Sequence, residues 1–156
     1  ARIWNAFVKN KINFKEYGKL FDTISVCLSK GLGCPVGSLL LTSSQYFENA
    51  LKIRKILGGG MRQSGFLAAC GIYALDNNIN RLKDDHLKAK AIGNVLSKLD
   101  FIKKVEPVET NIVIFELHDK FSSSLFQNKL SSKGIEIISM GDHKLIVVTH
   151  LSSNTY

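Results

Sequence analysis

One lysine lies between two apolar runs in the stretch CLSKGLGCPVG, residues 27–37. Lys30 directly follows TISVCLS (23–29), whose β-branched residues predict a strand. If that strand is buried, desolvation favours the neutral amine over the ammonium, and a neutral amine can form a Schiff base with an aldehyde. Gly31 and Gly33 would let the chain turn sharply and approach a flat cofactor. The same pattern also fits a solvated lysine at a strand end, since charged side chains are mostly exposed.

A second candidate is the glycine-rich stretch GGGMRQSG, residues 58–65. A glycine loop before a helix can present backbone N–H groups to a phosphate, and Arg62 could add a bidentate contact. The stretch lacks the G-x-x-x-x-G-K-[ST] pattern of a Walker loop. A helix C-cap followed by a new helix start is an equally good interpretation, because glycine is common just past a helix end.

The remaining reactive side chains give weaker signals. No Ser/His/Asp order stands out around the four histidines, and no Cys/His spacing matches a metal site, so we expect no metal. The cysteines number three and include no C-x-x-C pair. Cys27 and Cys70 lie in apolar surroundings and are interpreted as small core residues. This usage favours a reducing, intracellular setting, and we expect a cytoplasmic protein.

Length and charge limit the classes of protein to which this chain can belong. The 156 residues suffice for a sizeable core, and no apolar run approaches the roughly 20 residues of a membrane span. The net charge is +8, but the lysines are scattered and do not alternate with aromatic residues. This pattern favours solvated lysines over a nucleic-acid interface. The chain starts without Met and without a signal-peptide pattern, which suggests a fragment or a processed product.

The first part of the chain is expected to alternate strands and helices. A second strand is predicted over 37–43, and its continuous apolar character, like that of 23–29, suits strands covered on both faces. A helix should begin at Ser44 with a serine N-cap and end at the glycines. The next helix, about 61–77, is apolar on most sides and should be buried.

A third helix, about 81–99, should place an apolar stripe against the core. Its expected members are Leu82, Ile92, Val95, Leu96 and Leu99. Beyond it the pattern predicts a strand over 110–117, a helix over 121–132 and strands over 135–139 and 144–150. This β-α-β-β order is typical of a small α+β unit, so we expect two domains, 1–102 and 103–156.

Taken in order, several segments resemble the low-specificity threonine aldolases of the β-eliminating lyase group. The segments are ARIWNA, SVCLSKGLGCPVGSLL, KILGGGMRQSGFLAACGIYAL, RLKDDH, TNIVIFEL and VVTHL, and they span almost the whole chain. The resemblance implies an α/β chain, the C-terminal part of a fold-type I enzyme that uses pyridoxal 5′-phosphate. It would comprise the end of the large parallel or mixed-sheet domain and a small α+β domain without its last helix.

The resemblance also implies roles for particular residues. Lys30 matches the lysine that binds the cofactor covalently. Arg2 matches an arginine that helps to hold the substrate carboxylate and the cofactor ring. Arg62 matches an arginine that reaches the cofactor phosphate across a subunit interface, and Lys55 is a weaker candidate for the same region. The expected reaction is cleavage of L-threonine or L-allo-threonine, a β-hydroxy amino acid, to glycine and acetaldehyde by a homo-oligomer, a tetramer or a dimer.

Some positions depart from the family pattern. The aspartate expected to pair with the pyridine nitrogen belongs three residues before Arg2, and the N-terminal half with its phosphate loop is outside this sequence. Where the family's last strand carries an arginine for the substrate carboxylate, this chain has Ile146. Ser152 stands where the family usually has aspartate. The open alternatives are a truncated, non-catalytic relative, a related β-eliminating lyase, and, more distantly, a basic phosphate-binding or nucleic-acid-binding module.

Overall fold

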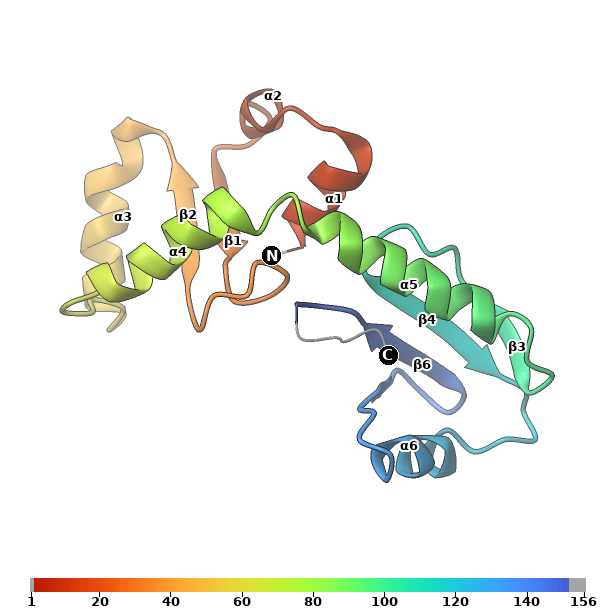
Figure 1. Ribbon diagram of the computed structural model, residues 1–156. Helices are drawn as coiled ribbons and strands as arrows, with labels where there is room; N and C mark the ends of the chain where they lie inside the picture. Colours follow the sequence, from red (N-terminus) through yellow and green to blue (C-terminus); the bar gives the residue numbers. More distant parts are fainter. Residues whose placement is uncertain (1, 152–156) are drawn as a thin grey trace. The chain divides into compact units, whose positions relative to one another are not determined.

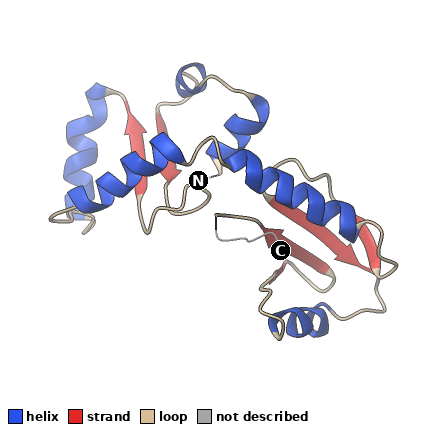
Figure 2. Ribbon diagram, viewed as in Figure 1, coloured by secondary structure: helices blue, strands red, loops and turns tan. Residues whose placement is uncertain are grey.

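The chain divides into two compact units, residues 1–81 and 82–156 (Figure 1). The computed structural model describes residues 2–151, so Ser152 and the end of the second expected domain lie outside the described residues. Both units combine helices with antiparallel strands (Figure 2), as expected for a mixed α/β chain. No helix in the described range is long and apolar enough to cross a membrane.

The first unit begins with two short helices that the sequence analysis did not predict. They are α1 (Ile3–Asn10) and α2 (Phe14–Gly18). Their aromatic rings form one cluster, in which Phe7 contacts Phe14 at 4.7 Å and Tyr17 at 5.1 Å between ring centroids. This cluster of aromatic side chains fixes the segment that follows Arg2.

A hairpin forms the centre of the first unit. Strands β1 (Thr23–Cys27) and β2 (Ser38–Thr42) pair antiparallel, close to the predicted ranges. Val26 of β1 is buried at 2% exposure. Strand β2 has no buried residue, and its three leucines are 41–56% exposed. The expectation that both strands are covered on both faces is therefore wrong for this chain by itself.

Two helices follow the hairpin. Helix α3 (Ser44–Ile56) begins at the predicted residue, with Ser43 as N-cap, and helix α4 (Gly65–Asn77) begins after the glycine-rich loop. The prediction that α4 is buried is wrong, because only Gly71 and Ala74 are buried. Its large side chains Phe66, Ile72 and Tyr73 are at least 62% exposed.

The second unit is an α+β unit with one sheet. In chain order it contains α5 (Leu82–Leu96), β3 (Ile102–Val105), β4 (Ile112–Leu117), α6 (Ser123–Ser131), β5 (Ile138–Ser139) and β6 (Lys144–Val148). The sheet order is β3-β4-β6-β5, and each neighbouring pair is antiparallel. The β-α-β-β part was predicted, whereas β3 was not, because the sequence IKKV is short and half charged.

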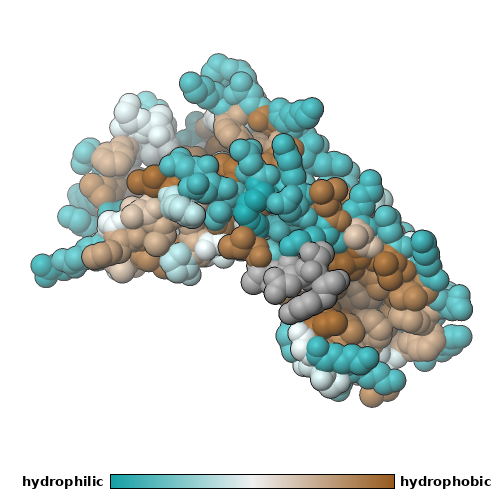
Figure 3. All heavy atoms as spheres, viewed as in Figure 1, coloured by the Kyte–Doolittle hydropathy of each residue, from teal (hydrophilic) through white to brown (hydrophobic). Residues whose placement is uncertain are grey.

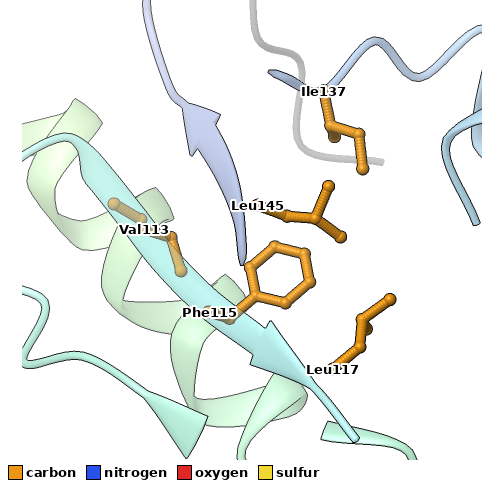
Figure 4. Packing of buried hydrophobic residues seen from close by; sticks show 6 residues of the cluster. Val113, Phe115, Leu117, Ile137 and Leu145 are labelled. Carbon is orange, nitrogen blue, oxygen red and sulfur yellow. The ribbon is translucent and has the colours of Figure 1, made fainter. Parts of the chain in front are cut away.

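The core of the second unit lies on one face of this sheet (Figure 4). Val113, Phe115 and Leu117 alternate along β4 and are almost fully buried together with Leu145 of β6. Helices α5 and α6 both contribute to this cluster, so both cover the same face. The ring of Phe115 meets that of Phe126 in α6 at 6.1 Å, edge to face.

Helix α5 belongs to the second unit, so the division falls at residue 81 and precedes the expected boundary at residue 102. The physical reason is packing, since Leu82 and Ala89 have no exposed surface and Ala89 joins the β-sheet core. A Cβ on Gly93 would lie 2.7 Å from Val108, so the helix closely approaches the connection between β3 and β4. Val95 was expected on the buried stripe but is 61% exposed.

The end of β6 is bound to α5 by a buried polar network. The Thr149 hydroxyl donates to the carbonyl of Asp85 in α5 at 2.7 Å. The Asn111 amide donates to the carbonyl of Thr149 at 2.8 Å, and the Thr149 N–H donates to the carbonyl of Asn111 at 3.0 Å. The threonine of the VVTHL segment therefore has a structural role: it joins the last strand to the helix that covers the sheet.

Candidate functional site

Lys30 lies in the connection between β1 and β2, at the first position of a tight turn. The N–H of Gly33 donates to the carbonyl of Lys30 at 2.8 Å and closes the turn. Gly33 has a φ of 74°, a left-handed conformation that favours glycine. The N–H of Leu28 donates to the carbonyl of Gly37 at 2.9 Å and closes the base of the connection. The hairpin itself therefore fixes the backbone of Lys30.

Helix α4 holds the same connection from outside the hairpin. The side-chain amide of Asn78, at the end of α4, donates to the carbonyl of Leu32 at 2.7 Å. A Cβ on Gly71 would lie 3.1 Å from the Leu28 side chain, so only glycine permits this close approach without a shift of Leu28. Leu28 and Leu32 are buried at 5% and 1% exposure. Gly71 and Asn78 therefore help to position the connection between β1 and β2, and the sequence analysis missed both.

The Lys30 side chain is exposed in this chain. Within residues 2–151 it forms no hydrogen bond or ion pair with another side chain. Within the described residues, Lys30 is therefore an exposed side chain shortly after the end of β1. Its amine is therefore accessible to a reagent from solvent while its backbone is held in place.

Cys34, in the same connection, has a structural environment. Its side chain is 6% exposed, and its thiol lies 3.6 Å from the carbonyl of Cys70 in α4. Burial raises the pKa of the Cys34 thiol, and the neighbouring Cys70 thiol raises it further. Because the thiolate is the nucleophilic form of cysteine, this environment argues against Cys34 as a nucleophile. The reactive candidate in the connection is therefore Lys30.

The three glycines, Gly58 to Gly60, close helix α3. The N–H of Gly59 donates to the carbonyl of Arg54 at 2.8 Å, and that of Gly58 donates to the carbonyl of Lys55 at 3.1 Å. Gly58 has a φ of 78°. These two bonds and the left-handed residue form a Schellman motif, so the C-cap interpretation of the sequence is the one that the structure shows.

Three positively charged side chains lie around the Schellman motif. A surface depression of about 370 Å³ is lined by Arg54, Lys55, Gly58, Gly60, Met61 and Arg62. Arg54 and Lys55 come from the last turn of α3, and the folded-back glycines bring Arg62 beside them. None of the three cations forms an ion pair with a described residue. Guanidinium and ammonium groups around a concave surface suit a phosphate. Arg54 was missed, although its place in the last helical turn before glycine was a usable signal.

Arg2 is exposed at the start of α1, where its carbonyl accepts a hydrogen bond from the N–H of Ala6 at 3.3 Å. In the part of the chain that the structure describes, no hydrogen bond joins any two of Arg2, Lys30 and Arg62. The structure thus brings Arg62 and Lys55 together but leaves the three principal candidates unconnected. Within the same part of the chain, no three His, Cys, Asp or Glu side chains gather as a metal site would require.

Ile146 lies in the middle of β6 and pairs with Ile114 of β4 and Ile138 of β5. These isoleucines lie on the sheet face opposite the core, because Leu145 and Phe115 alternate with them toward the helices. The position at which the resemblance implies an arginine is therefore the centre of an apolar row. Ile146 itself offers no charge to a substrate carboxylate.

Comparison with solved structures defines the class of fold. Over 96% of its length the chain superposes on 44% of a Listeria monocytogenes protein described as a "putative L-allo-threonine aldolase", with a TM-score of 0.78 and 16% identity. An Exiguobacterium protein described as a "putative aromatic amino acid beta-eliminating lyase/threonine aldolase" gives a TM-score of 0.77 at 15% identity over 96% of this chain and 45% of that chain. The α/β fold is therefore that of the C-terminal part of the threonine aldolase class.

The sequence comparisons give the family. The Beta-eliminating lyase family model matches residues 1–120, and the chain belongs to this family. Low-specificity L-threonine aldolase 1 of Arabidopsis thaliana is 37% identical over 153 residues, which are 96% of this chain and 43% of that protein. Low specificity L-threonine aldolase of Escherichia coli K12 is 56% identical over 125 residues, 80% of this chain and 37% of that protein. The chain thus spans less than half the length of these relatives.

Proposed function

We propose that the protein containing this chain cleaves L-threonine and L-allo-threonine to glycine and acetaldehyde with the help of pyridoxal 5′-phosphate. The observation that carries this proposal is Lys30, an accessible amine on a turn fixed by both the hairpin and α4. Lys30 lies within residues 1–120, which match the family model, and the relatives are named threonine aldolases. The proposal concerns an assembly that also carries the part of the family's fold outside residues 1–156.

Different residues of this chain fit the two ends of the cofactor. Lys30 supplies the amine that would hold it covalently, and an amine without an ion-pair partner among the described residues is free for that bond. Arg62, with Arg54 and Lys55 around the same depression, would hold the phosphate. When bound, the cofactor acts as an electron sink for the electrons of the broken Cα–Cβ bond. Arg2 is proposed to bind the substrate carboxylate.

We also propose the finer features implied by family membership. The complete protein would act as a homo-oligomer, a tetramer or a dimer, in the cytoplasm. Its reaction would serve threonine catabolism and glycine biosynthesis. The observation favouring a composite site is that no hydrogen bond joins Lys30 and Arg62 among the described residues, and in the family that the chain resembles the matching arginine reaches the phosphate across a subunit interface.

Reconstitution tests the function directly. Residues 1–156 alone should release no acetaldehyde from L-threonine in the presence of pyridoxal 5′-phosphate, because the phosphate and amine sites are not joined. The chain fused to the unmatched part of the E. coli relative should release acetaldehyde and glycine in equal amounts. A folded, cofactor-binding fusion that releases neither product would favour the non-catalytic alternative, and release of 2-oxobutanoate and ammonia instead would favour a related β-eliminating lyase.

Substitution of Ile146 tests how the substrate carboxylate is bound. In the same fusion, Ile146→Arg should tighten binding of L-threonine by about tenfold, since a hydrogen bond to a charged group contributes about 1.5–3 kcal/mol and part is offset by the apolar neighbours Ile114 and Ile138. The measurement is the KM for L-threonine, with Ile146→Met as the uncharged control. An unchanged KM would mean that the carboxylate is held elsewhere.

A further inference from the structure

The second unit contains a polar depression at the N-terminal end of helix α6. It has a volume of about 700 Å³. Its walls come from the loop that follows β4, the first turns of α6, and the end of β5 with the turn that leads to β6. All of these segments lie within residues 119–143, so the depression belongs to one unit. It includes none of the residues assigned above to the cofactor or the substrate.

The first turn of α6 presents hydrogen-bond donors to this depression. The Ser122 hydroxyl caps the helix by accepting from the N–H of Leu125 at 3.4 Å. The backbone N–H groups of Ser123 and Ser124 make no hydrogen bond to another residue within 2–151. They are the donors that the start of a helix leaves open, and the helix dipole favours a negative group beside them.

A buried hydroxyl independently indicates a ligand at this place. Ser123 is only 9% exposed, yet its hydroxyl forms no hydrogen bond with any described residue. Its neighbours differ, because the hydroxyls of Ser122 and Ser124 pair with each other at 2.7 Å. Buried polar side chains are normally paired, and leaving one unpaired is costly. Ser123 lines the depression, so a ligand bound there would supply the missing partner.

Hydrogen bonds between the three wall segments fix the shape of the depression. The side-chain amide of Gln127 in α6 donates to the carbonyl of Ile137, just before β5, at 3.1 Å. The Nδ1 atom of His143, in the turn before β6, lies 3.1 Å from the carbonyl of Phe121 in the loop after β4. The walls are therefore held together by the chain itself, and a ligand would enter a site that is already formed.

The charges around the depression define which kind of ligand fits. Asp119 pairs with Lys103 at 3.2 Å, so its charge is compensated. Two further charges line the depression: the Lys120 ammonium, 5.2 Å from the centre of the Phe121 ring, and the Asp142 carboxylate. Asp142 forms no ion pair in the part of the chain that the structure describes. One cation beside an open helix N-terminus and one unpaired carboxylate suit a ligand that carries both a negative and a positive group.

We propose that this depression binds a small zwitterionic α-amino acid. Its carboxylate would accept hydrogen bonds from the N–H groups of Ser123 and Ser124 and from the Ser123 hydroxyl, next to the Lys120 ammonium. Its ammonium group would pair with the Asp142 carboxylate. A simple anion such as phosphate fits less well, because it would leave Asp142 unpaired and would be repelled by it. The site needs no cofactor and does not depend on the proposed reaction.

A titration followed by the backbone amide signals in NMR tests the proposal on residues 1–156 without pyridoxal 5′-phosphate. The probes are glycine and L-serine, and both should shift the amides of Ser123, Ser124 and Gly141. Glycolate, which lacks the ammonium group, and ethanolamine, which lacks the carboxylate, are the comparison compounds. Each should bind about tenfold more weakly than glycine, because each leaves one of the two charged groups of the site without its partner.

Two substitutions separate the two ends of the ligand. Ser123→Ala should weaken glycine binding by about tenfold, because it removes a hydrogen bond to a charged group. Asp142→Asn should weaken it by about threefold, since an exposed charge pair contributes less. The matched controls are Ser132→Ala, at the other end of α6, and Asp100→Asn, an exposed acid that does not line the depression. Both controls should leave binding unchanged.

Three results would overturn the proposal. They are amide shifts confined to the first unit, glycine binding that neither Ser123→Ala nor Asp142→Asn weakens, and phosphate binding that exceeds glycine binding and increases in Asp142→Asn. The last result would define an anion site. Circular dichroism checks the folding of each variant, and the exposed turn position of Asp142 keeps the test decisive if Ser123→Ala does not fold. None of these readouts uses acetaldehyde release, so failure of this inference and failure of the proposed function are distinguishable.

Discussion

Replacing Lys30 with alanine in the fused polypeptide should lower the rate of L-threonine cleavage by about 10³-fold or more, as expected when a covalent catalytic group is removed. The structural basis is that Lys30 is exposed and is the one lysine in the connection between β1 and β2. The turn closed by Gly33 and the bond from Asn78 to the carbonyl of Leu32 hold the backbone around Lys30, and the connection contains no second lysine to substitute for it.

The control is Lys19→Ala, which removes an exposed lysine of the same unit that pairs with Glu16 at 2.8 Å. An exposed ion pair of this kind contributes little, so cleavage should stay within about twofold of wild type. Covalent attachment gives a second readout: borohydride reduction with pyridoxal 5′-phosphate should label the peptide containing Lys30 in the fusion. Full activity of Lys30→Ala, or labelling of a different lysine, would disprove the assignment.

Replacing Phe115 with alanine should destabilise the second unit by about 3–5 kcal/mol, the usual range for removing a buried aromatic side chain. Phe115 is 2% exposed and lies in the centre of β4 (Figure 4). Its ring contacts that of Phe126 in α6, with 6.1 Å between ring centroids. Because α6 and β4 meet through this pair of rings, the cavity would separate the helix from the sheet. That loss is comparable to the whole stability of many small domains.

The measurement is hydrogen exchange of the β4 and β6 amides, which follows the second unit specifically. Ile138→Ala is the control, because Ile138 belongs to the same sheet but is 63% exposed. It should change protection by less than about 1 kcal/mol. Equal protection in Phe115→Ala and wild type would mean that the core of the unit does not depend on the β4–α6 contact.

Local sequence patterns predicted most individual elements. The β-branched run before Lys30 forms β1, the serine at position 43 precedes α3, and the alternating residues of β4 place Phe115 in a core. These features depend on neighbours a few residues away, which a pattern records directly. The helices α1 and α2 escaped prediction because their stability comes from aromatic contacts such as Phe7 with Tyr17, which no periodic pattern marks.

Burial was predicted less well than secondary structure. An apolar sequence indicates that a segment is suited to an interior, but not whether the covering surface is present. Helix α4 and strand β2 were expected to be buried and are largely exposed in these 156 residues (Figure 3 shows apolar residues at the surface over α4).

The sequence by itself determined the family and the position of Lys30 after its strand, and it prompted the proposal that Arg62 binds an anion, since these depend on residue type and order. Only the tertiary structure showed that Gly58 caps α3 and thereby places Arg62 beside Arg54 and Lys55. It alone assigned α5 to the second unit and placed Ile146 within an apolar row. The last two features arise from contacts between residues distant in the chain, whose packing decides them, whereas the cap depends on the backbone conformation that the glycines adopt.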